Sequence, residues 1–322
     1  MPAVRCKIRT VNEILISSLV KTYPHQKDGR PALDGLRLSI PAGCLFGLVG
    51  PDGAGKTTLM RVLATVLLPS SGSAAIFGAD VRQDPEAIRR IAGYMPQNFS
   101  LYPDLTVEEN LRFFAEMQGV SPQDQEQRIP RLLDFARLQE FRARRSEHLS
   151  GGMRKKLALA CALVHNPTLL LLDEPTTGVD PVSRRELWHL LTEVIGKGVT
   201  VVVSTPYMDE AERCHRVGML YHGRLLAQAP PQELITAYPN QLVEMRTEPV
   251  GAARQALEQL PGLLSWRMVG DRLRLAVPDA ARALSQLRSL LSSLQAETLL
   301  LRQARPSMED VFIHLSAEGG GE

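Results

Sequence analysis

The sequence predicts an α/β domain built on a parallel sheet, followed by a smaller α+β domain. Short apolar runs, such as LLLL at 169–172 and VTVVV at 199–203, are flanked by helical patterns, as in parallel strands covered on both faces. Strand and helix patterns of this kind recur from about residue 55 to residue 235. After residue 236 a different and shorter alternation begins. We therefore expect one domain at 14–235 and a second at 236–315.

Each part of the first domain has its own pattern. Residues 14–49 alternate apolar runs with turn residues, which predicts a strand-rich, antiparallel β subdomain. From residue 55, GKTTLMRVLATVLL has a helical pattern. Residues 105–148 are mostly helical in character, because ENLRFFAEM and RLLDFARLQEF carry apolar residues three and four positions apart. This segment predicts an inserted helical subdomain.

The second domain, residues 236–315, has the pattern strand, helix, strand, strand, helix, strand. That order is typical of a ferredoxin-like unit, and about 80 residues is an ordinary domain size. It contains no recognisable chemical motif. We expect residues 1–13 to form an N-terminal extension and the tail SAEGGGE, 316–322, to be disordered.

Composition limits the possible functions. The chain has 322 residues, of which 44% are hydrophobic and 22% charged, as in an ordinary folded protein. Its net charge of +2 includes no basic block that would bind nucleic acid. The four cysteines form no CxxC pair, so neither a zinc site nor a disulfide framework is expected. No run approaches the roughly 18 apolar residues of a membrane span, so another chain would supply any spanning part.

The segment GPDGAGKTT matches the phosphate-binding pattern GxxxxGK[ST]. Its glycines would let backbone N–H groups close around phosphate oxygens, and the start of the following helix would add a partial positive charge. Lys56 would reach the β- and γ-phosphates, and Thr57 would ligate Mg²⁺. A glycine turn with a chance lysine is the alternative, but the strand before the loop and the helix after it favour a nucleotide site. The predicted nucleotide-binding residues of the loop are Gly50, Pro51, Asp52, Gly53, Ala54, Gly55, Lys56, Thr57 and Thr58.

A phosphate-binding loop of this kind also needs a carboxylate to hold the metal ion, usually at the end of a neighbouring apolar strand. Asp173 ends the run TLLLLD and is the predicted metal ligand. Glu174 follows directly and is placed to orient and deprotonate an attacking water. The alternative is an Asp-Glu pair that only makes a loop polar, and the upstream phosphate loop argues against it.

The segment LSGG at 149–152 lies about 20 residues before the strand that ends at Asp173. Ser-Gly-Gly alone would usually be only a turn, but its place between the phosphate loop and this strand is a specific signal. With it, residues 14–235 resemble the ATP-binding cassette of ABC transporters. GPDGAGKTT corresponds to the Walker A loop, YMPQN with Gln97 to the Q-loop and LSGG to the signature. LLLLDEP corresponds to the Walker B strand and TTGVD, with Asp180, to the D-loop.

The resemblance implies roles for residues outside the phosphate loop. Gln97 would sense Mg²⁺ and the γ-phosphate and would take part in catalysis with Lys56 and Glu174. Tyr23 would stack on adenine, although a tyrosine at a strand end can also serve packing alone. The remaining predicted nucleotide contacts, which would include ATP held by a second subunit, are Ser150, Gly151, Gly152 and Asp180.

The resemblance also implies partners and a location. The working unit of the family is a head-to-tail pair of cassettes, here a homo- or heterodimer, closed by ATP and opened by hydrolysis. FSLYPDLTVEENLRFFAEMQGV resembles the part that receives a cytoplasmic helix of a membrane permease, and RPSMEDVFIHL resembles the ending of exporter subunits. The expected cofactors are ATP and Mg²⁺. The expected location is the cytoplasmic face of the cell membrane, reached through separate permease subunits.

One position departs from the family pattern. Pro206 stands where these cassettes usually have a histidine that contacts the γ-phosphate, and proline has neither a side-chain donor nor a backbone N–H. Locally, Thr205 is expected as a helix N-cap with Pro206 at the first helical position. Thr205, Tyr207 or a water could replace the missing donor. Because Glu174 is retained, we expect hydrolysis; the alternatives are a poorly hydrolysing regulatory cassette of a heterodimer and a soluble non-transport ABC ATPase.

Overall fold

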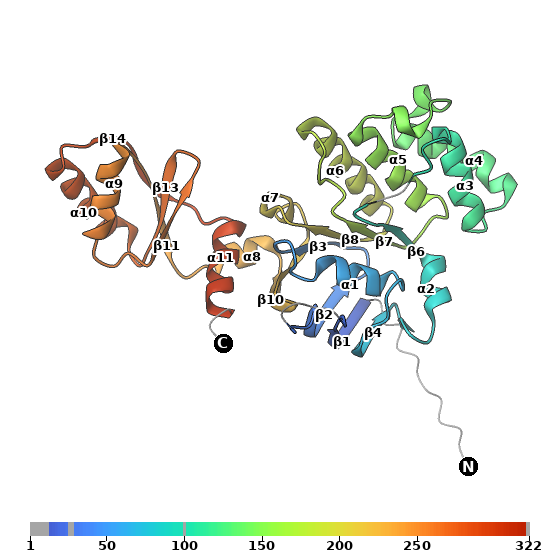
Figure 1. Ribbon diagram of the computed structural model, residues 1–322, viewed down its shortest axis with the longest axis horizontal. Coiled ribbons are helices and arrows are strands. Elements are labelled where there is room, and N and C mark those ends of the chain that lie inside the picture. Colours follow the sequence, from blue (N-terminus) through green and yellow to red (C-terminus); the bar gives the residue numbers. More distant parts are fainter. Residues whose placement is uncertain (1–12, 25–28, 99–100, 320–322) are drawn as a thin grey trace, which may run out of the picture. The chain divides into compact units, whose positions relative to one another are not determined.

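The computed structural model describes residues 13–24, 29–98 and 101–319, which form two compact units (Figure 1). The first unit contains the described residues up to Pro231 together with Leu315–Gly319, and the second is Gln232–His314. In the part of the chain that the structure describes, no helix is both long enough and apolar enough to cross a membrane.

A six-stranded sheet forms the centre of the first unit. Five neighbouring strands, β9, β3, β8, β7 and β6, run parallel, and the edge strand β10 pairs antiparallel with β9. Strands β3, β7 and β8 are buried along their whole length, which explains their apolar sequences and confirms the predicted parallel sheet. In spatial order the strands are β10 (Arg224–Ala229), β9 (Arg216–Tyr221), β3 (Leu45–Val49), β8 (Thr200–Thr205), β7 (Leu169–Asp173) and β6 (Ala92–Met95).

A four-stranded antiparallel sheet confirms the predicted strand-rich start. Its first strand alternates buried and exposed side chains because one face packs into the core. Helix α1 (Lys56–Leu63) lies between this sheet and the six-stranded one (Figure 1), and its Leu59, Met60 and Leu63 join their shared apolar core. In spatial order the strands are β2 (Leu33–Pro41), β1 (Glu13–Lys21), β4 (Ser71–Ile76) and β5 (Ala79–Asp80).

The predicted helical subdomain is also present. It has its own apolar core, in which Leu111, Leu133 and Leu157 from three helices are buried. Thr106 caps the first of these helices through a reciprocal capping box with Glu109. The elements are α3 (Val107–Met117), α4 (Pro122–Phe135), the 3₁₀ turns η1 (Gln139–Phe141) and η2 (Ser146–His148), and α5 (Gly151–Leu163).

Helices α2, α6 and α7 also belong to the first unit, and α8 runs from the end of the first unit into the second. Helix α6 lies with α5 on the face of the six-stranded sheet opposite α1 (Figure 1). The bounds are α2 (Pro85–Ile91), α6 (Pro181–Gly196), α7 (Met208–Ala211) and the connecting α8 (Pro231–Thr236).

The second unit is an antiparallel sheet with two helices packed on one face. Its core comes from alternate residues of the central strands, such as Val243, Met245 and Leu275, and from Leu287 of the second helix. The spatial order of the sheet is β12 (Ser265–Val269), β13 (Arg272–Val277), β11 (Gln241–Glu248) and β14 (Glu297–Ala304). The helices are α9 (Val250–Glu258) and α10 (Ala280–Ser293).

The chain termini differ from expectation. The tail predicted as disordered from 316 begins inside a helix, because α11 (Met308–Gly319) runs on from the buried Met308 and Val311 with no helix breaker before Gly319. Residues 320–322 lie outside the described residues. The N-terminal extension expected at 1–13 lies outside them too, except for Glu13, which pairs with Pro41 and so belongs to β1.

Candidate ATP-binding site

The phosphate loop joins β3 to α1, and close packing leaves no room for a side chain at two of its glycines. A Cβ added to Gly50 would lie 2.2 Å from the carbonyl oxygen of Leu220. Gly55 has φ 103°, and a Cβ there would lie 2.5 Å from the carbonyl oxygen of Ala32. Inside the loop, Lys56 Nζ donates to the carbonyls of Gly50 at 2.8 Å and Pro51 at 3.0 Å. The loop therefore holds the buried ammonium group at its centre.

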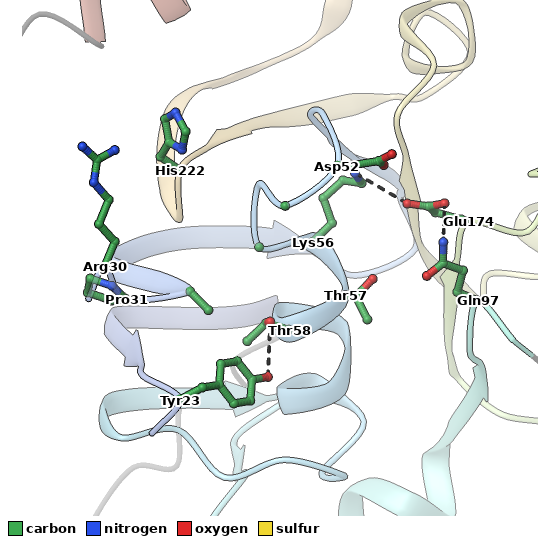
Figure 2. A pocket seen from close by; sticks show the side chains of 13 residues that line it. Tyr23, Arg30, Pro31, Asp52, Lys56, Thr57, Thr58, Gln97, Glu174 and His222 are labelled. Atoms are coloured by element: carbon green, nitrogen blue, oxygen red, sulfur yellow. Dashed lines mark hydrogen bonds and ion pairs between the residues drawn. The ribbon is translucent and has the colours of Figure 1, made fainter. Parts of the chain in front are cut away.

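A cavity of about 540 Å³ opens over this loop (Figure 2). It brings together residues that the sequence places up to 199 positions apart, from Tyr23 to His222. Nine of its lining residues are predicted site residues: Tyr23, Asp52, Gly53, Gly55, Lys56, Thr57, Thr58, Gln97 and Glu174.

The Walker B aspartate lies at the edge of this site. Asp173 is fully buried, and its Oδ1 accepts hydrogen bonds from Thr57 Oγ1 at 3.2 Å and Ser204 Oγ at 2.5 Å. Its Oδ2 is buried and has no hydrogen-bond partner among the described residues. Ser204 is a contact that the sequence reasoning missed. Its signal would have been its position at the end of β8, the strand that pairs with β7.

Glu174 lies at the centre of a hydrogen-bonded group. Its Oε2 accepts from Gln97 Nε2 at 2.9 Å and from Thr177 Oγ1 at 3.2 Å, and its Oε1 lies 3.6 Å from Lys56 Nζ (Figure 2). Its backbone is in the left-handed region, with φ 48°, a conformation that non-glycine residues adopt mainly where the surroundings enforce it. The Glu174 N–H donates to Ser204 Oγ at 3.0 Å, which helps to hold this conformation.

The opposite end of the cavity carries Tyr23. This side chain is 37% exposed, and its hydroxyl lies 3.4 Å from Thr58 Oγ1 (Figure 2). The exposed ring therefore remains available to a ligand. Arg30 and His222 also line the cavity and were not predicted, because neither belongs to a motif and His222 comes from the β9–β10 turn, far along the chain.

The signature and D-loop residues lie outside this cavity. Ser150 caps α5 by accepting from the Met153 N–H at 3.2 Å. Asp180 caps α6 by accepting from the N–H groups of Val182 and Ser183, and these bonds lower its pKa. Gly152 packs against Ser183, with room for no side chain, and Gly151 lines a separate hollow of about 590 Å³. The chain thus presents these residues away from its own phosphate loop.

The segment at Pro206 differs from expectation. Thr205 ends β8 and is not an N-cap, and Tyr207, not Thr205, directly precedes α7. The Thr205 hydroxyl donates to Glu210 Oε2 at 2.6 Å and accepts from the Tyr207 N–H at 3.1 Å. Since Thr205 is fully buried and its proton is already donated, it is not the replacement donor. The Tyr207 ring packs against the Arg184 guanidinium, whose Cζ lies 4.4 Å from the centroid of the ring.

The fold and the site define a P-loop nucleotide-binding cassette. A family model described as "ABC transporter" matches residues 33–177. The chain is 35% identical to the daunorubicin/doxorubicin resistance ATP-binding protein DrrA of Streptomyces peucetius, over 93% of this chain and 91% of that protein. It therefore belongs to the ATP-binding subunits of ABC transporters, an ATPase family, and is similar to members of the exporter type.

Two other similarities set the scale of this match. The chain is 41% identical to the probable multidrug ABC transporter ATP-binding protein YbhF of Escherichia coli (strain K12), over 95% of this chain and 52% of that protein. It thus spans about half the length of this relative. A solved dimeric structure of the cassette MJ0796, in a post-hydrolysis state bound to ADP and Pi, matches with a TM-score of 0.62 and 27% identity, covering 67% of this chain and 98% of that one.

Proposed function

We propose that this chain binds and hydrolyses ATP to energise a separate membrane permease of an exporter. The observation that carries the proposal is the cavity itself. The site combines three features: the buried ammonium group of Lys56, the hydrogen-bonded pair Thr57–Asp173, whose oxygens could ligate a metal ion, and the hydrogen bond from Gln97 to Glu174. This set can bind a triphosphate, place a metal ion and activate a water.

Asp173 and Thr57 fit a Mg²⁺ ion. Asp173 Oδ2 is buried and has no hydrogen-bond partner among the described residues, so it could accept a bond from a donor or coordinate a cation. Thr57 Oγ1 lies beside the other oxygen of the same carboxylate. No cluster of three His, Cys, Asp or Glu side chains occurs within the described residues, which suits an ion held mainly by phosphate and water oxygens. Gln97 would be a third protein contact. When bound, Mg²⁺ would neutralise charge on the phosphates.

Each of the remaining groups has a distinct task. Lys56 would bind β- and γ-phosphate oxygens in place of the loop carbonyls. Glu174 would take a proton from the attacking water, and Gln97, hydrogen-bonded to it, would orient its carboxylate. Tyr23 would stack on the adenine ring.

A second cassette would complete the site. Ser150, Gly151, Gly152 and Asp180 lie outside the chain's own nucleotide cavity, so they can reach ATP only on another subunit. The dimeric state of the similar cassette MJ0796 supports a head-to-tail pair. The pair would bind permease subunits at the cytoplasmic face of the membrane. The names of YbhF and DrrA suggest drug-like cargo for such a transporter.

We also propose that the second unit is a ferredoxin-like domain. The element order β11, α9, β12, β13, α10, β14 and the fully antiparallel sheet support it. Boundaries at 14–235 and 236–315 remain our proposal for the two domains.

The test compares wild type with Glu174→Gln, each assembled with its cognate permease. Glu174→Gln keeps the size and hydrogen bonding of the side chain but removes the base, so ATP should still bind while phosphate release is lost. A wild type no faster than the variant would refute the proposal and favour the regulatory cassette, for which Pro206 is the motivating residue.

A further inference from the structure

The side chain of Lys155 extends from the signature helix α5 to the backbone of the proposed catalytic residue Glu174. Its Nζ donates to the backbone carbonyl of Gln97 at 3.1 Å and approaches that of Glu174 at 3.5 Å. The lysine belongs to α5, whereas its two partners follow β6 and β7 and are 58 and 19 positions away. One side chain thus connects three separate segments of the site.

The same two partners are joined through their side chains. Gln97 Nε2 donates to Glu174 Oε2, and both residues line the cavity. Lys155 holds the main chain of both residues, and so constrains both ends of this hydrogen bond. It also contacts the carbonyl of the residue with φ 48°, whose peptide orientation must be maintained by its surroundings.

A purely structural role explains Lys155 poorly. The acceptors of its hydrogen bonds, the carbonyls of Gln97 and Glu174, are neutral, whereas the neighbouring Lys156 forms an ion pair with Glu186 at 2.9 Å. Even partial burial of an ammonium group is unfavourable when no carboxylate is directly paired with it. The first turn of α5 has no acidic residue to offset it.

We propose that Lys155 is a positioning residue that couples the signature of this chain to its own catalytic site. This inference rests on the proposed function, in which Ser150, Gly151 and Gly152 bind ATP held by the second subunit. These residues form the start of α5, and Lys155 follows in the next turn of the same helix. Engagement of the signature would therefore be transmitted along a rigid helix to the Gln97–Glu174 pair.

Three variants of the full-length chain test the coupling. Lys155→Met removes the charge and the hydrogen-bond donors but keeps the length of the side chain. Lys155→Arg keeps the charge and the donors. Arg154→Met is the matched control, because Arg154 is the preceding residue and its side chain is exposed. We expect Lys155→Met to lower kcat about tenfold or more, the scale of one hydrogen bond from a charged group. The Kd for ATP should stay unchanged and cooperativity between the two sites should weaken. Lys155→Arg should retain most of the activity.

Hydrogen exchange supplies a readout that does not need hydrolysis. The Thr177 N–H donates to the Glu174 carbonyl, so its exchange should accelerate in Lys155→Met and not in Lys155→Arg or Arg154→Met. Unchanged exchange at Thr177 would overturn the inference, as would equal kcat losses in Lys155→Met and Arg154→Met. A wild type that does not hydrolyse ATP, with exchange changed as expected, would instead refute the proposed function alone.

Discussion

Gln97 Nε2 donates a hydrogen bond to Glu174 Oε2 at 2.9 Å. The bond joins the segment after β6 to the segment after β7. It fixes the carboxylate on the side facing Lys56, which lies 3.6 Å from Oε1. The orientation of the proposed base is therefore set by a residue 77 positions away.

Gln97→Ala should slow hydrolysis more than it weakens nucleotide binding. A hydrogen bond to a charged group contributes about 1.5–3 kcal/mol, so we expect kcat to fall by about 10- to 100-fold. The Kd for ATP measured without Mg²⁺ should change little, because Gln97 lies beside the base rather than the phosphate loop. A kcat within twofold of wild type would contradict the positioning role.

Pro206→His should increase the rate of hydrolysis. A donor directed at a transition-state oxygen contributes up to about 10²- to 10³-fold in rate, and Thr205 is already committed to Glu210. The measurement is kcat at saturating ATP. Pro206→Ala is the matched control, because it restores the backbone N–H without a side-chain donor. If both variants accelerate the reaction equally, the missing side chain is not the cause.

Tyr23→Ala should weaken ATP binding. Stacking of a base on an aromatic ring contributes about 1–3 kcal/mol, so a rise in Kd of about 5- to 150-fold is expected. Tyr23→Phe keeps the ring and loses only the 3.4 Å contact with Thr58, and should bind ATP almost as wild type does. Equilibrium binding of ATP to the isolated subunit measures both. Equal affinities of the Ala and Phe variants would show that the ring does not contact adenine.

Asp310→Asn should destabilise the second unit. Asp310 is buried and accepts from Arg267 Nη2 at 2.8 Å and Arg274 Nη2 at 2.7 Å. Burial acts to raise its pKa, but the hydrogen bonds from these arginines outweigh burial and lower it. Breaking a buried pair from one side costs about 3–5 kcal/mol. Denaturant unfolding of the full chain at neutral pH measures the loss.

The same carboxylate predicts a pH dependence. Since its folded pKa lies below the unfolded value of about 3.9, its contribution is complete above that pH and disappears as the pH falls through the folded pKa. Asp310→Asn should lack this acid-sensitive part. Glu309→Gln is the control: Glu309 is 54% exposed in its pair with Arg267, so the change should cost at most about 1 kcal/mol. Equal losses in the two variants would exclude the buried network as the cause.

The sequence alone determined the cassette fold with its parallel sheet, and it predicted most of the residues that line the candidate nucleotide site. The buried strands β7 and β8 are apolar because both faces are covered, and the phosphate loop is one contiguous segment with the pattern GxxxxGK[ST]. Such features depend on residues that are close together in the chain, so they can be recognised from the sequence.

Only the tertiary structure decided how distant groups share hydrogen bonds. It placed Ser204 on Asp173, Lys155 between Gln97 and Glu174, and His222 on the cavity wall. It also showed that the Thr205 proton is donated to Glu210, which removes a donor that the sequence allowed. The residue type of a serine, threonine or lysine does not reveal which acceptor its hydroxyl or ammonium group bonds. Its role depends on which strand ends the fold brings within about 3 Å, and no local pattern encodes that distance.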